Sequence, residues 1–252
     1  MTNMNSVKLA LYWIPTLLFG LTMGAILLVF HPLQWLALRV GYEAHKSTVD
    51  AMIWCLNKSL LLVGCSREIV NLAGELPKDR PMIIVSNHQS MFDIPAIGQV
   101  LRKHHPKYVA KRSLARGIPS VSFNIRHGGS ISIDRADREQ AIHVISKFCD
   151  YLAQNNYAGC IFPEGSRSKG GQLAPFKQGG LAAMIEAMPQ ATIVPVVLQN
   201  FWKIGKYRMT PIPFGIPLKC FILTPVEKAG KTTTEIIDTI ELQMKQYLAL
   251  AS

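Results

Sequence analysis

The sequence predicts an α/β fold, with a mixed central sheet flanked by helices and preceded by membrane-associated N-terminal helices. From residue 82 onward, short apolar runs typical of buried strands alternate with stretches of helical periodicity. Residues 9–30 carry no charged side chain, and apolar residues make up 49% of the 252-residue chain. We therefore divide the chain into membrane-associated helices over residues 1–66 and one α/β domain over residues 67–252.

The uncharged segment over residues 9–30 is about 33 Å long as a helix, which is enough to span a bilayer. No cleavage signature follows it, so we expect a retained anchor rather than a signal peptide. Basic residues are more frequent after the segment than before it. The positive-inside rule then places the α/β domain in the cytoplasm, at the inner membrane if the protein is bacterial. A monotopic hairpin lying in one leaflet is the alternative.

A second N-terminal stretch, residues 47–63, is predicted to form an amphipathic helix. Its apolar residues recur at helical spacing beside Trp54. Such a face fits either the membrane surface or the core of the α/β domain, and the sequence leaves both open. These apolar residues are Val49, Met52, Ile53, Leu56, Leu60 and Val63.

The remaining elements are predicted from hydrophobic periodicity. The best-marked helix is 137–155, because Asp137 can cap it and Gln140 follows three residues later. Further helices are expected near 92–104, 178–188 and 233–249. Strands are expected over 68–72, 82–86, 107–110, 130–134, 159–162, 192–198 and 218–223.

The charge of the chain is concentrated in one segment. Lysine and arginine number 27 against 16 acidic residues, and +7 of the net +11 falls between Arg102 and Arg138. This excess indicates a surface for an anion such as nucleic acid, an anionic lipid headgroup or a phosphorylated substrate. The five cysteines form no Cys-x-x-Cys pair and are expected to be small buried side chains in a reducing compartment.

His88 and Asp93 are the candidate catalytic residues. The apolar run over 82–85 is expected to be a buried strand, which places His88 on the turn at its end. Asp93 would then lie near the start of a helix, close enough to hold one imidazole nitrogen. The other nitrogen is left free to accept a proton. A histidine and aspartate without a nucleophile of their own suit a general base that activates a substrate hydroxyl.

Three further stretches each combine a predicted strand with residues suited to chemistry. Arg135 follows the strand ending at Asp134, where a guanidinium can clamp phosphate through two parallel hydrogen bonds. In residues 162–168, Gly165 permits close backbone approach and Arg167 adds charge. Pro195 interrupts an apolar strand, which suggests a bulge or a strand end facing a pocket.

Together these stretches resemble the glycerolipid acyltransferase family, and within it the lysophosphatidic acid acyltransferases. The Asn-His-x4-Asp block matches Asn87, His88 and Asp93, and the Phe-Pro-Glu-Gly-Thr-Arg-Ser block matches residues 162–168. The Gly-x-Ile-Phe-Ile-Asp-Arg block matches residues 129–135, except that Ser132 stands where the family usually has Phe, which leaves the exact lysolipid open. A Val-Pro-Val strand and Phe-Lys-x-Gly match residues 194–196 and 176–179.

The resemblance implies a glycerophosphate-acyltransferase-like fold and an acyltransferase domain over residues 67–252. It implies transfer of an acyl chain from acyl-CoA or acyl carrier protein to lysophosphatidic acid, with no cofactor, no metal and no nucleic acid. The implied acceptor-binding residues are Arg135, Glu164, Gly165, Ser166, Arg167 and Lys177, with Lys111 as an oxyanion or phosphate partner. Pro195 and the strand over 193–197 would line the space for the acyl chain.

Other classes of protein explain less of the sequence. Ser166 lacks the Gly-x-Ser-x-Gly turn of a serine hydrolase, and His88 with Asp93 lacks a third spaced ligand for a metal. Transfer to another lysolipid remains an alternative. A non-catalytic protein that binds anionic lipid would account for the charge and the anchor but not for the blocks containing His88, Glu164 and Arg167.

Overall fold

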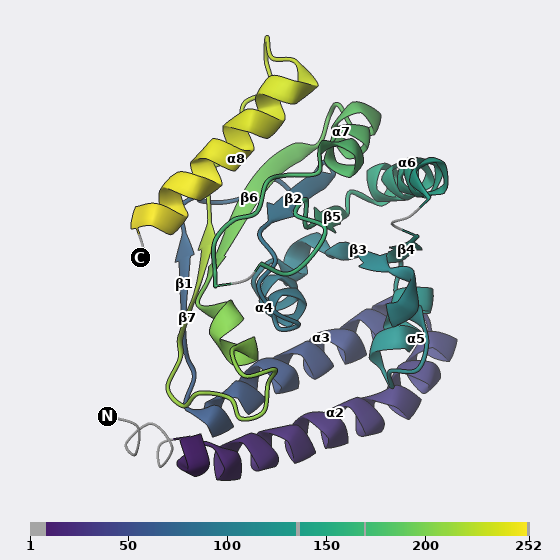
Figure 1. The fold of residues 1–252 in the computed structure, drawn as a ribbon. Helices are drawn as coiled ribbons and strands as arrows, with labels where there is room; N and C mark the ends of the chain where they lie inside the picture. The colour runs from purple at the N-terminus through teal and green to yellow at the C-terminus, as the bar shows by residue number, and fades with distance from the viewer. Residues whose placement is uncertain (1–8, 135–136, 169, 251–252) are drawn as a thin grey trace.

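The computed structural model describes residues 9–134, 137–168 and 170–250. Its centre is a seven-stranded sheet in the order β1-β7-β6-β2-β5-β3-β4 (Figure 1). The strands are β1 (Ser66–Asn71), β2 (Met82–Ser86), β3 (Lys107–Lys111), β4 (Ile131–Ile133), β5 (Ala158–Ile161), β6 (Thr192–Gln199) and β7 (Pro217–Ile222).

The sheet is mixed, as predicted. Strands β2 to β6 run parallel to one another, whereas β7 pairs antiparallel with β6, and β1 pairs parallel with β7. Consequently the carboxyl ends of β2, β3 and β5 meet at one edge of the sheet, which is where ligands gather in α/β folds.

Helices cover both faces of the sheet, and the alternation of side chains along β2 divides the core between them. Met82 and Ile84 face the N-terminal helices, and Ile83 and Val85 face the opposite layer. The first layer holds α2 (Trp13–Val40), α3 (Tyr42–Ser59) and α4 (Asp93–Val100), with α5 (Val121–His127) beside β4. The second holds α6 (Arg138–Asn155), α7 (Gln178–Ala187) and α8 (Thr233–Leu250).

Several boundaries differ from the predictions: the helix expected over 9–30 continues to Val40, and the one expected over 47–63 spans Tyr42–Ser59. Helix α4 stops at Val100 instead of continuing to 104, because residues 102–104 form a 3-10 turn and His105 adopts the left-handed conformation with φ of 48°. Helix α5, which periodicity did not indicate, is seven residues long and therefore too short to show a clear repeat. Short 3-10 helices also occur at Leu60–Val63, Arg112–Ala115 and Phe201–Gly205.

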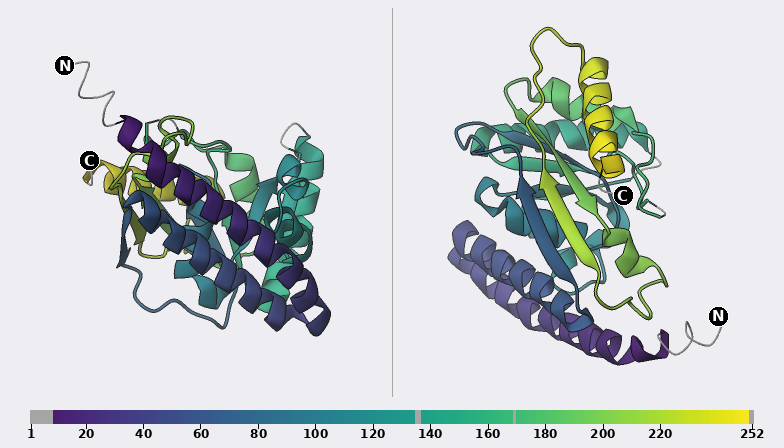
Figure 2. Two further views of the ribbon diagram at one scale, coloured as in Figure 1. Left: turned by 90° about the horizontal axis from the view of Figure 1, so that it is seen from below. Right: turned by 90° about the vertical axis from the view of Figure 1, so that its left-hand side faces the viewer.

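The two N-terminal helices lie side by side beneath the domain (Figure 2). All six apolar residues of the stretch 47–63 are buried in the core that includes Met82 and Ile84. Of the two alternatives left open by the sequence, the structure therefore shows a core helix, with Trp54 on its exposed side. The separation of the chain at residue 66 stays a prediction.

Helix α2 is joined to the domain along its length. The Ile212 amide donates to Thr16 Oγ1 at 2.9 Å, the Ser120 hydroxyl donates to the Leu27 carbonyl at 2.6 Å, and Phe19 packs on Phe92. Among the described residues, the helix Leu9–Val40 is the one that is long and apolar enough to cross a membrane. Only 11% of the most apolar 18-residue stretch of this helix is buried inside the protein. It thus packs on the domain by one face and exposes a large apolar surface.

Candidate active site

His88 lies on the turn that leaves the carboxyl end of β2, as predicted. Its Nδ1 is 2.7 Å from Asp93 Oδ2, and Asp93 is the first residue of α4. The imidazole ring stacks on Phe162, with 4.4 Å between ring centroids and an angle of 27° between the planes. Because Asp93 engages Nδ1, the proton on that nitrogen is held toward the carboxylate and Nε2 remains the basic nitrogen.

The Asp93 carboxylate is fully buried and held by four donors. Oδ2 accepts from the backbone amides of Gln89 at 2.6 Å and Ser90 at 2.8 Å as well as from His88, and Oδ1 accepts from the Ser90 hydroxyl at 3.2 Å. The start of α4 adds the positive end of a helix dipole. A buried carboxylate needs this many partners, and they fix its position relative to the imidazole.

The loop over residues 162–168 braces the histidine turn. Glu164 Oε1 accepts from the His88 amide at 2.6 Å, and Oε2 accepts from the Ala174 amide at 2.9 Å. The Ser168 amide donates to the His88 carbonyl at 2.7 Å. Burial raises the pKa of Glu164, while the two amides oppose this effect. These contacts give Glu164 a structural role, so its expected part in binding substrate stays a prediction.

Asn87 clamps the start of the turn onto β6. Its side-chain Nδ2 donates to the Leu198 carbonyl at 2.8 Å, and its Oδ1 accepts from the Leu198 amide at 2.7 Å. The sequence indicated Asn87 only through the family block. Its function could not be found by local pattern, because Leu198 is 111 residues away.

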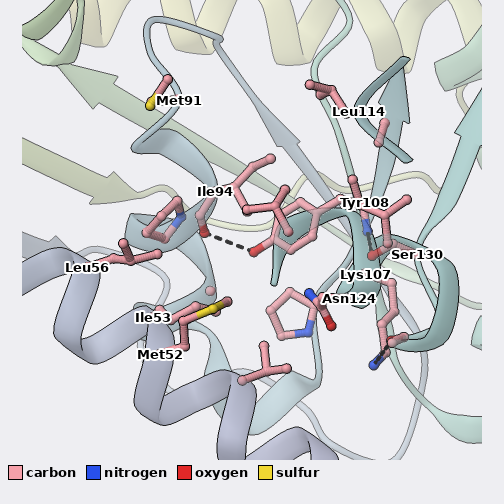
Figure 3. A pocket seen from close by; sticks show the side chains of 18 of the residues that line it. Met52, Ile53, Leu56, Met91, Ile94, Lys107, Tyr108, Leu114, Asn124 and Ser130 are labelled. Atoms are coloured by element: carbon pink, nitrogen blue, oxygen red, sulfur yellow. Dashed lines mark hydrogen bonds between the residues drawn. The ribbon is translucent and has the colours of Figure 1, made fainter. Parts of the chain in front are cut away.

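An apolar cavity of about 330 Å³ extends from His88 between the sheet and the N-terminal helices (Figure 3). Tyr108 crosses its wall and donates from its hydroxyl to the Ile94 carbonyl at 3.1 Å. Apolar side chains from three helices and the segment after β3 form most of the wall. They are Met23 and Leu27 of α2, Met52, Ile53 and Leu56 of α3, Val121 and Ile125 of α5, and Leu114.

A second, more polar pocket of about 360 Å³ lies on the other side of the histidine turn. Gln89, Ser90, Trp202 and Lys206 contribute to its wall. Met91 and Arg167 line both spaces, and His88 lines the apolar one. The apolar compartment and the second, more polar compartment thus adjoin at Met91 and Arg167, with His88 on the wall of the first.

Several of the other predicted residues gather here. Lys111, exposed at the end of β3, lines the apolar cavity with His88 and Arg167. Gly165 has φ of +71°, so glycine is favoured by the backbone conformation, and a Cβ there would lie 3.0 Å from the exposed Lys177 side chain. Ser166 is exposed on the same loop. Arg135 lies outside the described residues.

Pro195 lies away from both cavities. It is buried in the middle of β6 opposite Val85 and lines neither cavity. The strand over 193–197 is covered on both faces by the two cores. The expected part of Pro195 in lining the space for the acyl chain stays a prediction.

The polar part of the cavity wall was not predicted from the sequence. Lys107, Tyr42, His45 and Asn124 line the cavity away from His88. The basic excess over 102–138 was a signal for Lys107, but nothing in the sequence distinguished a buried lysine from an exposed one.

Comparisons with known proteins agree with this architecture. A family model described as Acyltransferase matches residues 69–199, more than half of the chain. The 1-acyl-sn-glycerol-3-phosphate acyltransferase alpha of Mus musculus is 29% identical over 166 residues, which are 65% of this chain and 56% of the relative. The 1-acyl-sn-glycerol-3-phosphate acyltransferase of Helicobacter pylori is 39% identical over 126 residues, 48% of this chain and 50% of the relative. The chain thus spans about half the length of such curated relatives.

A solved structure shows the same fold along the chain. The crystal structure of the 1-acyl-sn-glycerophosphate (LPA) acyltransferase, PlsC, from Thermotoga maritima superposes with a TM-score of 0.77 and 22% sequence identity, covering 97% of each chain. The N-terminal helices and the sheet are therefore shared features of the two folds.

Proposed function

The chain belongs to the acyltransferase family, and we propose that it transfers a fatty acyl chain from a thioester to the free hydroxyl of lysophosphatidic acid, giving phosphatidic acid. The observation that carries this proposal is the His88 and Asp93 pair on the wall of an apolar cavity that is also lined by Arg167. A reaction that joins an acyl chain to a phosphate-bearing alcohol needs a base close to both an apolar space and a cation.

In the proposed mechanism His88 acts as a general base. Nε2 takes the proton of the acceptor hydroxyl while the oxygen attacks the thioester carbonyl, so that a C–O bond forms. The C–S bond then breaks, and the thiolate leaves with the proton from the imidazolium. Asp93 stabilises the imidazolium through the 2.7 Å contact with Nδ1. No acyl group becomes attached to the protein in this sequence of steps.

The two compartments supply binding. Burial of methylene groups in the apolar cavity would contribute about 0.8 kcal/mol for each. Arg167, which lines both compartments, would hold the acceptor phosphate with help from Lys111. We extend the same role to Arg135, Gly165, Ser166 and Lys177 on the family pattern. The donor would be acyl-CoA or acyl carrier protein, with no further cofactor.

We also propose that the protein binds the membrane through α2. Leu21 and Leu28 are 73% and 64% exposed on this helix, and Trp13 and Trp35 are exposed toward its two ends. The contacts of Thr16 and Leu27 with the domain support an α2 that lies in the interface of one leaflet rather than across the bilayer. That position would present the cavity to lipid, with the domain on the cytoplasmic side.

The acceptor is tested by comparing lysophosphatidic acid with monoacylglycerol, which lacks the phosphate. Arg167→Ala is expected to lower kcat/KM for lysophosphatidic acid about 10- to 100-fold, because a hydrogen bond to a charged group contributes roughly 1.5–3 kcal/mol. Monoacylglycerol should be little affected. Arg80→Ala is the matched control, since Arg80 is exposed and its side chain contacts Asp79. An equal loss of kcat/KM for both acceptors would show that Arg167 does not bind the acceptor phosphate. A panel of other lysolipids would then identify the acceptor.

A further inference from the structure

The apolar cavity ends in a polar wall that is far from the catalytic histidine. Lys107 of β3 pairs with Gly159 of β5, which pairs with Ile83 of β2. His88 stacks on Phe162, which is three residues beyond Gly159, so it lies about 10 Å from Lys107 along the strand direction. In Figure 3, Met91 of the histidine turn lies at the upper left of the cavity and Lys107 at the lower right.

Lys107 is a buried cation with spare hydrogen-bonding capacity. It is only 5% exposed, and its ammonium donates to the Tyr42 hydroxyl at 3.1 Å and the Gly128 carbonyl at 2.7 Å. An ammonium has three protons, so one makes no hydrogen bond to an oxygen, although the ammonium also lies 4.9 Å and 5.2 Å from the ring centroids of Tyr42 and Tyr157. Within the described ranges no carboxylate forms an ion pair with Lys107, whereas the neighbouring Lys46 is paired with Asp50.

His45 is a second buried polar side chain on this wall. It is 1% exposed, it lines the same cavity from α3, and its Nε2 has no hydrogen-bond partner among the residues that the structure describes. Burial and the charge of Lys107 lower the pKa of His45, so the neutral ring is favoured. A neutral imidazole nitrogen without a proton is an acceptor.

These two groups are poorly matched to a hydrocarbon chain end. A methyl group beside them would leave His45 Nε2 without a partner and the third Lys107 proton with only the tyrosine rings, and unsatisfied buried polar groups are costly. A hydroxyl matches both, because its oxygen can accept from Lys107 while its proton is donated to His45. Asn124, on α5, adds a further donor and acceptor to the same wall.

Building on the proposed acyltransferase function, we propose that Lys107 and His45 form a subsite that recognises a hydroxyl group near the far end of the transferred acyl chain. The preferred donor is then a hydroxylated acyl thioester whose length brings the hydroxyl to this wall. Shorter chains do not reach the subsite and gain nothing from it.

The test uses acyl-CoA donors of increasing length, each with and without a terminal hydroxyl, on the full-length protein. At the length that reaches Lys107, the hydroxylated donor is expected to have a kcat/KM about 10-fold higher, since one such hydrogen bond is worth about 1.4 kcal/mol. Lys107→Met and His45→Leu, each checked for folding by circular dichroism, should abolish this preference. Lys103→Met, the same change at an exposed position, should keep it.

Displacement of a fluorescent fatty acid by hydroxylated and plain fatty acids measures the same preference without catalysis. If no donor is transferred but the hydroxylated acid still binds more tightly in a manner that depends on Lys107, the proposed function fails and the subsite stands. A wild-type protein that favours the plain chain at every length, or a Lys107→Met variant that retains the preference, would overturn the subsite.

Discussion

Replacing Asp93 with asparagine separates the charge of this side chain from its geometry. An asparagine in a histidine pair often turns its amide nitrogen toward the imidazole and imposes the wrong tautomer, with a large loss of rate. Here that orientation is opposed, because the Gln89 and Ser90 amides both donate to the same atom, Asp93 Oδ2. Only an oxygen can occupy that position, so the asparagine oxygen should face His88 and the amide nitrogen should face the Ser90 hydroxyl.

The expected decrease in kcat of Asp93→Asn therefore comes from loss of the negative charge alone. A charge-assisted hydrogen bond contributes roughly 1.5–3 kcal/mol and a neutral one roughly 0.5–1.5 kcal/mol. Weakening the contact between His88 and residue 93 by about 1–1.5 kcal/mol lowers kcat about 10-fold. Asp93→Ala removes the orienting oxygen as well and leaves two backbone amides unpaired, so it should cost far more in both rate and stability.

The assay is acyl transfer to lysophosphatidic acid under saturating substrate, with thermal unfolding measured in parallel. A folded Asp93→Asn variant with activity as low as that of Asp93→Ala would show that the amide does turn toward His88. The reasoning from the Gln89 and Ser90 amides would then be refuted.

Two further predictions concern Lys107 and α2. Burial lowers the pKa of Lys107 from 10.5 to about 8, so between these values the unfolded state binds more protons and the free energy of unfolding should rise with pH by up to about 3 kcal/mol. Urea unfolding at pH 7.5 and pH 10 should show this rise relative to Lys107→Met, and equal pH dependence in both proteins would contradict it. Changing Leu21 and Leu28 together to Glu should abolish pelleting with phospholipid vesicles, whereas the control Leu242→Glu, at a leucine that is 57% exposed on α8, should pellet like the wild type. Retained pelleting of the double variant would exclude this face of α2 as the membrane contact.

Most of the fold and the centre of the site were predictable because their signals are local. The run over 82–86 is buried on both faces and therefore reads as a continuous apolar strand, and the partner of His88 is only five residues away. The same holds for α6, whose cap is visible in the sequence as Asp137 and is made by its side chain accepting from the Gln140 amide.

The remaining features depend on distant contacts. Helical periodicity shows that α3 has an apolar face, but the pattern is the same whether that face meets lipid or the sheet. Glu164 was expected to bind substrate on the family pattern alone, and the sequence could not show that its oxygens accept from the amides of His88 and Ala174. The family resemblance implied that Pro195 lines the space for the acyl chain, and this stays a prediction, since Pro195 lies in the middle of β6 and lines neither cavity.

The central claim is that His88 is the general base of a direct transfer between thioester and lysophosphatidic acid. The measurement is phosphatidic acid formation by purified wild-type protein and by His88→Ala, with Asp93 and the folded state intact and with vesicle binding checked. Loss of a positioned base is expected to lower turnover by about 10²–10⁴. A His88→Ala protein that folds, binds vesicles and retains more than about a tenth of wild-type turnover would contradict the account.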